Sequence, residues 1–300
     1  MSKVRDVFMR NSISKVNPLV TVYMPTHNRR DLLERAVNSV LGQTYTNIEL
    51  IIVDDGSVDD TWEYLQSVKD DRLRAFKISP ARGACNARNK AIFEARGDFI
   101  TGLDDDDYFL QDHIIDFIDA WLFSKPYVVA IYSNILRQTD KGCKKAYPKL
   151  DQCKAEDLIY ANWPGNQVFT KTEYLRKISG FNADLPAWQD FDCWYRLLKV
   201  NGGVATRKNS HTYVLDISHP HERISNGDCK KMYSAWSVFC ESNNIGEKDR
   251  KIVKLLLVPY NKRRPSFQSL IYKVVGFQKW HNFRHALLLI YFGLFYRFFS

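Results

Sequence analysis

The stretch Ile48-Glu49-Leu50-Ile51-Ile52-Val53-Asp54-Asp55-Gly56-Ser57 sets the fold class of this 300-residue chain. It begins as an almost continuous apolar run, which is typical of a strand buried on both faces in the middle of a parallel sheet. The run ends in acidic, glycine and serine residues, which indicate a turn. We therefore expect an α/β protein in which polar residues follow the buried strands.

The same pattern extends on both sides of this strand. Further strands are expected at 19–24, 73–78 and 99–103, with helices beginning near Asp31, Asp60 and Ala84 between them. This β-α-β alternation implies a parallel sheet with right-handed crossovers. Pro25 is expected to stop the first strand, and Asp31 to cap the first helix.

Beyond residue 110 the pattern is of the α+β type. Strands are expected at 128–132, 167–169 and 212–217, and a helix begins at Gln189. The basic stretch 141–149 has the composition of a loop.

Polar clusters follow three of the expected parallel strands, at 25–29, 54–57 and 104–107. Ligands bind beyond the carboxyl ends of the strands in such sheets, so these clusters are expected to converge on one site. The third cluster is four consecutive aspartates, and two unit charges ~4 Å apart repel by ~4 kcal/mol at an effective dielectric of 20. A hard divalent cation, Mg²⁺ or Mn²⁺, would compensate them. A solvated acidic turn or a helix N-terminus is the alternative.

Composition leaves several partners open. The net charge of +9 suits nucleic acid, phosphorylated ligands or an anionic membrane surface. Six cysteines lie apart with no CxxC pair, so we expect reduced thiols and a cytosolic protein. Neither a signal peptide nor a Walker A or GxGxxG loop is evident.

Four segments occur in an order that resembles family 2 glycosyltransferases with the GT-A fold. They are Val20–Arg29, Gln43–Thr61, Ala87-Arg88-Asn89 and Gly97-Asp98-Phe99-Ile100. The aspartate cluster then stands where that family carries its DxD motif. The resemblance covers about residues 18–224 and implies a Rossmann-like, mostly parallel sheet flanked by helices.

The resemblance also implies a division of the chain. A lead-in, 1–17, precedes a GT-A domain at 18–225, whose nucleotide-sugar half is 18–110 and whose acceptor half is 111–225. Residues 226–300 are expected to form a C-terminal helical extension that associates with a membrane.

Site roles follow from the resemblance by position. Asp54 matches the aspartate that accepts a hydrogen bond from the nucleotide base, and Asp104 and Asp106 match the DxD pair. The run of aspartates leaves the register open, with Asp105 and Asp107 as alternatives. The expected nucleotide-sugar-binding residues are Pro25, Thr26, Asn28, Asp54, Arg82, Arg88, Asp104 and Asp105. The expected ligands of Mn²⁺ or Mg²⁺ are Asp106, Asp104, His219 and His221.

Asp190 matches the general base of the family. Gln189 stands where many members carry glutamate, so the neighbouring negative charge is missing and we expect a less elevated pKa for Asp190. A helix cap is the alternative role of Asp190. Arg82 and Arg88 are expected to steady the phosphates or the acidic cluster, and for Arg88 the alternative is a structural ion pair.

The implied reaction is metal-dependent, inverting transfer of a hexose from a UDP-sugar, UDP-glucose or UDP-galactose. The implied acceptor is a lipid-diphosphate-linked saccharide, such as GlcNAc-diphosphate-lipid, in O-antigen or polysaccharide synthesis. The alternatives are a DxD-type phosphatase, a basic nucleic-acid-binding protein and an inactive relative. Nucleic acid is not the expected partner, because lysine and arginine are spread along the chain without a dense stripe.

The tail suggests a location. The apolar run 286–296 is shorter than the ~20 residues that span a bilayer. Basic residues flank it, and Lys262-Arg263-Arg264 precedes it. We expect a helix lying on the cytoplasmic leaflet, so that the protein is peripheral on the inner face of the cell membrane. A terminal helix packed on the domain is the alternative.

Overall fold

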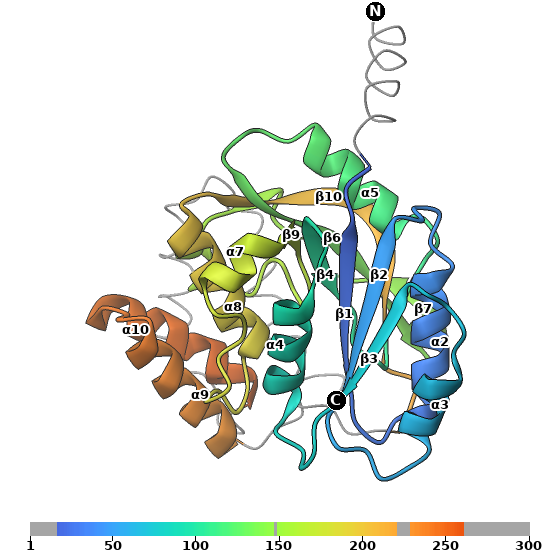
Figure 1. Cartoon of the computed structure of the whole chain (residues 1–300). Coiled ribbons are helices and arrows are strands. Elements are labelled where there is room, and N and C mark those ends of the chain that lie inside the picture. The colour runs from blue at the N-terminus through green and yellow to red at the C-terminus, as the bar shows by residue number, and fades with distance from the viewer. Residues whose placement is uncertain (1–16, 147–148, 221–228, 261–300) are drawn as a thin grey trace, which may run out of the picture.

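The computed structural model describes residues 17–146, 149–220 and 229–260, and they form an α/β fold with one central sheet (Figure 1). The strand order is β3-β2-β1-β4-β9-β6-β10-β5, with β7 beside β6 and β8 beside β10. The strands are β1 Val20–Thr26, β2 Ile48–Asp54, β3 Leu73–Lys77, β4 Phe99–Gly102, β5 Tyr108–Phe109, β6 Val128–Thr139, β7 Gly142–Lys145, β8 Gln152–Cys153, β9 Phe169–Lys171 and β10 Val204–Asp216. The helices are α2 Arg30–Leu41, α3 Thr61–Ser67, α4 Ala84–Glu94, α5 His113–Leu122, α6 Ala155–Leu158, α7 Thr172–Lys177, α8 Gln189–Asn201, α9 Cys229–Ser242, α10 Glu247–Val253 and the 3₁₀ helix η2 Lys254–Tyr260.

Strands β3, β2, β1 and β4 are parallel, as the alternating sequence predicts. The expected stop at Pro25 is wrong, because β1 continues to Thr26 and Pro25 pairs with Val53 of β2. On its other side β1 pairs with β4 only up to Tyr23, opposite Gly102. Beyond that point β1 has a free edge, where proline is tolerated because no N–H is required.

Helix α2 begins two residues earlier than a cap at Asp31 would require. It starts at Arg30, and its N-cap residue Arg29 makes no side-chain capping bond, so the predicted cap is wrong. Asp31 lies in the first turn, where a carboxylate interacts favourably with the helix dipole. The buried face of the helix carries Leu33, Ala36, Val37 and Val40, as its apolar periodicity predicts.

The second half of the chain extends the same sheet. Strand β9 pairs antiparallel with both β4 and β6, and the long strands β6 and β10 then run parallel. The expectation of a loop over 141–149 is wrong in part, because β7 pairs with β6 to form a hairpin. Hydrogen-bonded strands therefore connect the two halves of the domain.

The described part of the C-terminal extension is helical and packs on α8 (Figure 1). Phe239 of α9 is fully buried, with ring centroids 4.7 Å from Phe191 and 5.3 Å from Tyr195 of α8. None of the helices in the described ranges is long and apolar enough to cross a membrane. The run 286–296, for which membrane contact is predicted, lies outside those ranges.

Candidate active site

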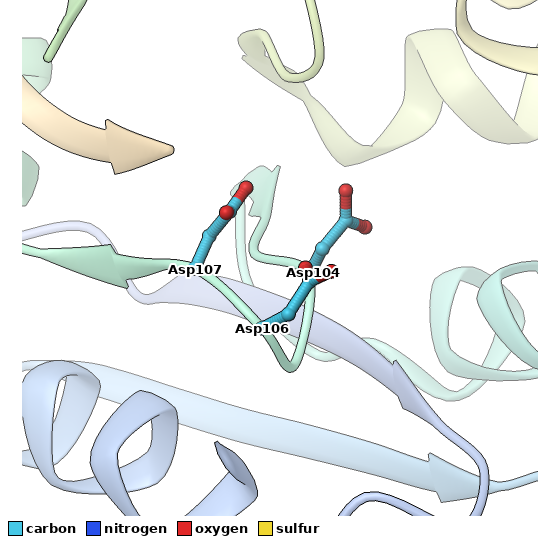
Figure 2. A group of neighbouring side chains, drawn as sticks. All are labelled: Asp104, Asp106 and Asp107. Carbon is cyan, nitrogen blue, oxygen red and sulfur yellow. The ribbon is translucent and has the colours of Figure 1, made fainter. Parts of the chain in front are cut away.

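The turn between β4 and β5 carries the four aspartates. Carboxylate atoms of Asp104, Asp106 and Asp107 lie within 4.8 Å of one another (Figure 2). The last residue of β4 is Gly102, where a Cβ would collide with the Tyr23 ring and the Gln167 side chain. A cluster of hard carboxylate oxygens this close fits a divalent cation such as Mg²⁺ or Mn²⁺.

Hydrogen bonds hold the aspartates of the turn in place. Arg29 Nη1 donates to Asp105 Oδ1 at 3.0 Å and to Asp106 Oδ2 at 2.9 Å. Asp107 accepts from the Tyr213 hydroxyl at 2.7 Å and from a backbone N–H of β10 at 2.9 Å. These bonds hold Asp107 against β10 and turn Asp105 toward Arg29. Asp105 is the one aspartate of the turn outside the cluster of three.

Burial governs the protonation of these groups. It raises the pKa of Asp105 to about 6, an effect that the charge of Arg29 opposes and that of Asp106 reinforces. Burial also raises the pKa of Asp107 well above its usual value, and the charges of Asp106 and Asp104 add to the rise. Positive charge placed among these carboxylates would favour their ionised forms.

One of the two predicted histidines reaches the cluster. His219 follows β10, and its Nε2 lies 3.5 Å from Asp106 Oδ2 with only 6% of the side chain exposed. This places an imidazole beside the carboxylates at the position that the sequence suggests. His221, the other predicted ligand, lies outside the described residues.

The ends of β1 and β2 form another wall of the site. Two of the residues predicted to bind the nucleotide sugar, Pro25 and Thr26, line a cavity. Three others, Asn28, Asp54 and Arg82, are not among its lining residues. Asp54 is fully buried, accepts the Ser57 N–H at 2.9 Å and lies 3.7 Å from Lys77 Nζ.

Asp55, which belongs to the polar cluster 54–57 but is not among the predicted binding residues, does line the cavity. Its carboxylate accepts the backbone N–H groups of Arg82 at 2.7 Å and Gly83 at 2.6 Å. Asp55 therefore fixes the loop before α4, and Arg82 contributes its backbone to this contact. The position of Asp55 directly after Asp54 at a strand end is the sequence signal that could have identified it.

Asp190 lies at the start of α8, and its contacts differ from those of a cap. The N-cap residue is Trp188, which has a left-handed backbone (φ 61°) and makes no side-chain capping bond. Asp190 Oδ2 accepts from Asn162 Nδ2 at 2.7 Å. Asn162 Oδ1 in turn accepts the Gly165 N–H at 3.2 Å, which orients the amide. Asn162 belongs to none of the motifs quoted from the sequence, so this partner is not predicted.

The pKa of Asp190 is raised, chiefly by burial. The Phe191 N–H, the charge of Arg88 and the hydrogen bond from Asn162 oppose the rise, whereas the charge of Asp104 adds to it. A buried carboxylate with a raised pKa in a cavity is suited to accept a proton.

Arg88 of α4 joins the acidic turn to the start of α8. Its Nη2 donates to Asp104 Oδ1 at 2.8 Å, and its Nη1 donates to Gln189 Oε1 at 3.2 Å. Arg88 thus forms an ion pair with an aspartate of the acidic turn and also lines the cavity, an arrangement that fits both of its predicted roles. The Gln189 amide accepts this bond without adding the negative charge that a glutamate would place beside Asp190.

The acidic turn, His219, Arg88 and Asp190 all line one cavity of about 1010 Å³. Its acidic and basic lining residues include Arg29, Asp55, Arg88, Asp104, Asp105, Asp106, Asp107, Arg137 and Asp190. Apolar lining comes partly from the C-terminal extension, through Met232 of α9 and Leu256 of η2. The extension is therefore part of the wall of this cavity.

Comparison with known proteins agrees with this geometry. The model of the family described as "Glycosyl transferase family 2" matches residues 21–172, which include β1, the acidic turn and β9. The chain belongs to glycosyl transferase family 2. It is thus a glycosyltransferase, and the family membership favours neither the phosphatase nor the nucleic-acid-binding alternative.

Two relatives illustrate how this family 2 member compares with other proteins. It is 36% identical over 231 residues to the putative colanic acid biosynthesis glycosyl transferase WcaA of Escherichia coli (strain K12), covering 72% of this chain and 78% of the relative. It is 39% identical over 183 residues to the UDP-Glc:alpha-D-GlcNAc-diphosphoundecaprenol beta-1,3-glucosyltransferase WfaP of Escherichia coli, covering 60% and 70%.

A solved structure confirms the expected fold of the family 2 domain. S. aureus TarS 1–349 in complex with UDP-GlcNAc superimposes with a TM-score of 0.62 at 17% identity, over 80% of this chain and 71% of that chain. The GT-A architecture predicted from the order of motifs is therefore correct.

Proposed function

We propose that this family 2 enzyme transfers a hexose from a UDP-sugar, UDP-glucose or UDP-galactose, to a lipid-diphosphate-linked saccharide during polysaccharide synthesis. The observation that carries the proposal is that one cavity is lined by both the acidic turn and Asp190, and Arg88 donates to Asp104 and to Gln189, the neighbour of Asp190. The name of WfaP, a UDP-Glc-dependent enzyme acting on GlcNAc-diphosphoundecaprenol, supports this choice of donor and acceptor.

The donor end would use the acidic turn. Asp104 and Asp106, with His219 or His221, would hold Mn²⁺ or Mg²⁺, and a bound cation would offset the negative charge of the leaving diphosphate. Pro25, Thr26 and Asp105 would contact the nucleotide sugar. Asn28, Asp54 and Arg82 would act by shaping the strand-end loops around it.

At the acceptor end, Asp190 would accept the proton of the attacking hydroxyl. The hydroxyl oxygen forms a bond to the anomeric carbon while the bond from that carbon to UDP breaks. Attack from the face opposite the leaving group inverts the anomeric centre, so an α-linked donor gives a β-linked product. The division into a donor half at 18–110 and an acceptor half at 111–225 belongs to this proposal.

We further place the enzyme at the inner face of the cell membrane through residues 286–296, where a lipid-linked acceptor would be presented. The apolar composition of this run and the basic residues around it support the placement.

The decisive experiment supplies the full chain with Mn²⁺, each UDP-hexose and a synthetic GlcNAc-diphosphate-lipid. Glycosylated lipid and UDP are expected in equal amounts. Asp190→Asn is expected to lower turnover by about 10²–10⁴-fold, the usual contribution of a positioned base. Asp106→Asn is expected to abolish the response to Mn²⁺.

Asp71→Asn serves as the control for these variants, because Asp71 is exposed in the turn before β3. It is expected to match the unmodified enzyme. Unchanged turnover in Asp190→Asn would refute the role of the base, and release of inorganic phosphate without acceptor would refute the reaction class.

A further inference from the structure

Arg137 differs from the other arginines that line the cavity. Arg29 and Arg88 each donate to aspartates of the acidic turn. Arg137 lies near the end of β6, and within the described ranges it makes no ion pair. Its Nε is buried, and that donor has no hydrogen-bond acceptor among the described residues. A buried charged donor without a partner is costly unless a ligand satisfies it.

A second cation stands beside Arg137. In the β6–β7 hairpin Arg137 is paired directly with Lys144, and directly opposed residues of an antiparallel pair project from the same face. Like charges in this arrangement repel each other. Lys144 is exposed and, in the part of the chain that the structure describes, has no carboxylate partner. An anion between the two side chains would remove the repulsion.

The hairpin is joined to the wall that carries His219. Arg137 pairs with Leu215 of β10, and the Ile217 N–H donates to the neighbouring Gln138 carbonyl at 2.9 Å. Leu215, Ile217 and His219 all line the cavity. Since His219 lies beside Asp106, Arg137 stands along the same edge of the cavity as the acidic turn, on the strand that belongs to the acceptor half.

We propose that Arg137, assisted by Lys144, forms a diphosphate-binding subsite of this cavity. A planar guanidinium binds phosphate oxygens through two parallel hydrogen bonds, and the lysine adds a point charge. The inference rests on the proposed function, in which both substrates carry a diphosphate. The ligand is therefore the diphosphate of the UDP-sugar or that of the lipid-linked acceptor, and binding measurements separate the two.

The test measures equilibrium binding of two probes to the full chain, UDP and farnesyl diphosphate, by titration calorimetry. Arg137→Ala is expected to weaken the binding of one probe by about 10–100-fold, which corresponds to the loss of a hydrogen bond to a charged group. Lys144→Ala is expected to weaken the same probe by about 2–5-fold, because an exposed charge contributes less. Arg137→Lys should recover part of the loss.

Lys145→Ala is the matched control, since it removes one charge from the adjacent position of the same strand, which faces the other side of the hairpin. It is expected to leave both affinities unchanged. A selective loss of UDP binding assigns the subsite to the donor, and a selective loss of farnesyl diphosphate binding assigns it to the acceptor. The proposal is overturned if Arg137→Ala, or Arg137→Met if the alanine variant does not fold, binds both probes normally.

Steady-state kinetics provide a second readout. If the subsite serves the acceptor, Arg137→Ala raises the KM of GlcNAc-diphosphate-lipid but leaves the KM of a phosphate-free alkyl glycoside of GlcNAc unchanged. Equal effects on both acceptors and on UDP-sugar would contradict a phosphate contact. Failure of the unmodified enzyme to transfer any hexose would refute the proposed function alone, because the binding arm does not depend on turnover.

Discussion

Asn162 has a role that can be tested through the pH dependence of the reaction. Its amide donates to Asp190 and so opposes the rise that burial causes in the Asp190 pKa. Asn162→Ala removes this donor, and the pKa is expected to rise further. Because the proposed base Asp190 would have to be ionised to accept a proton, activity is expected to fall as the pH falls through that pKa. The acid limb of kcat/KM is expected to move up by about 1 pH unit, the effect of about 1.4 kcal/mol.

Asn166→Ala is the natural control for Asn162→Ala. Asn166 belongs to the same turn and lines the same cavity, but no hydrogen bond joins it to Asp190. Its substitution should leave the acid limb in place, whatever it does to the rate. An acid limb that stays fixed in Asn162→Ala would show that the hydrogen bond does not tune the base.

The site residues differ in how far sequence could predict them. Asp104, Asp106 and Asp190 stand at a strand end or a helix start inside recognisable motifs, so their positions follow from the local sequence. The residues that hydrogen-bond to them cannot be predicted in this way. Arg29 meets Asp106 across 77 positions and Asn162 meets Asp190 across 28. Such contacts depend on how distant turns pack, which no local pattern encodes.

Helices and strands are predictable in the N-terminal part of the chain, where strands and helices alternate, and less so beyond it. Strands β1 and β2 follow from apolar runs, and all of their residues are buried, whereas the neighbouring strand β3 is only partly buried. Strands β6 and β10 are much longer than their apolar cores suggest. Their outer parts carry polar residues and are held by pairing with each other and, for β6, with β7. Pairing partners, rather than local propensity, decide such segments.

Helix α9 is expected to be part of the folded core and not an appendage. Phe239→Ala removes a fully buried ring packed between Phe191 and Tyr195. The free energy of unfolding, measured with urea, is expected to fall by about 3–5 kcal/mol, as for other buried phenylalanines. Because Phe191 follows Asp190 directly, turnover should fall as well.

Phe93→Ala provides the comparison for Phe239→Ala, because Phe93 is 54% exposed on α4. Its unfolding free energy should change by no more than about 0.5 kcal/mol. If both variants proved equally stable, the contact between α9 and α8 would contribute nothing to folding.

At the scale of the whole molecule, the charge of +9 and the apolar tail predict how the protein meets a membrane. The full chain is expected to sediment with vesicles that contain anionic lipid, and less so at high salt, since the Debye length shrinks from ~10 Å at 0.1 M to ~3 Å at 1 M. Removal of residues 283–300 should lower this binding while leaving transfer to a water-soluble acceptor intact. A truncated protein that partitions like the full chain would contradict the proposed anchoring.

The sheet that connects both halves of the domain has a consequence for the timing of catalysis. Strands β1, β4, β9, β6 and β10 are hydrogen-bonded neighbours in one continuous sheet. Enzymes built from two hinged domains lose entropy in each turnover when they close over their substrates. Because α8 contacts β6 of this sheet, we expect the separation between the acidic turn and the proposed base Asp190 to be set during folding and not by closure over the substrates.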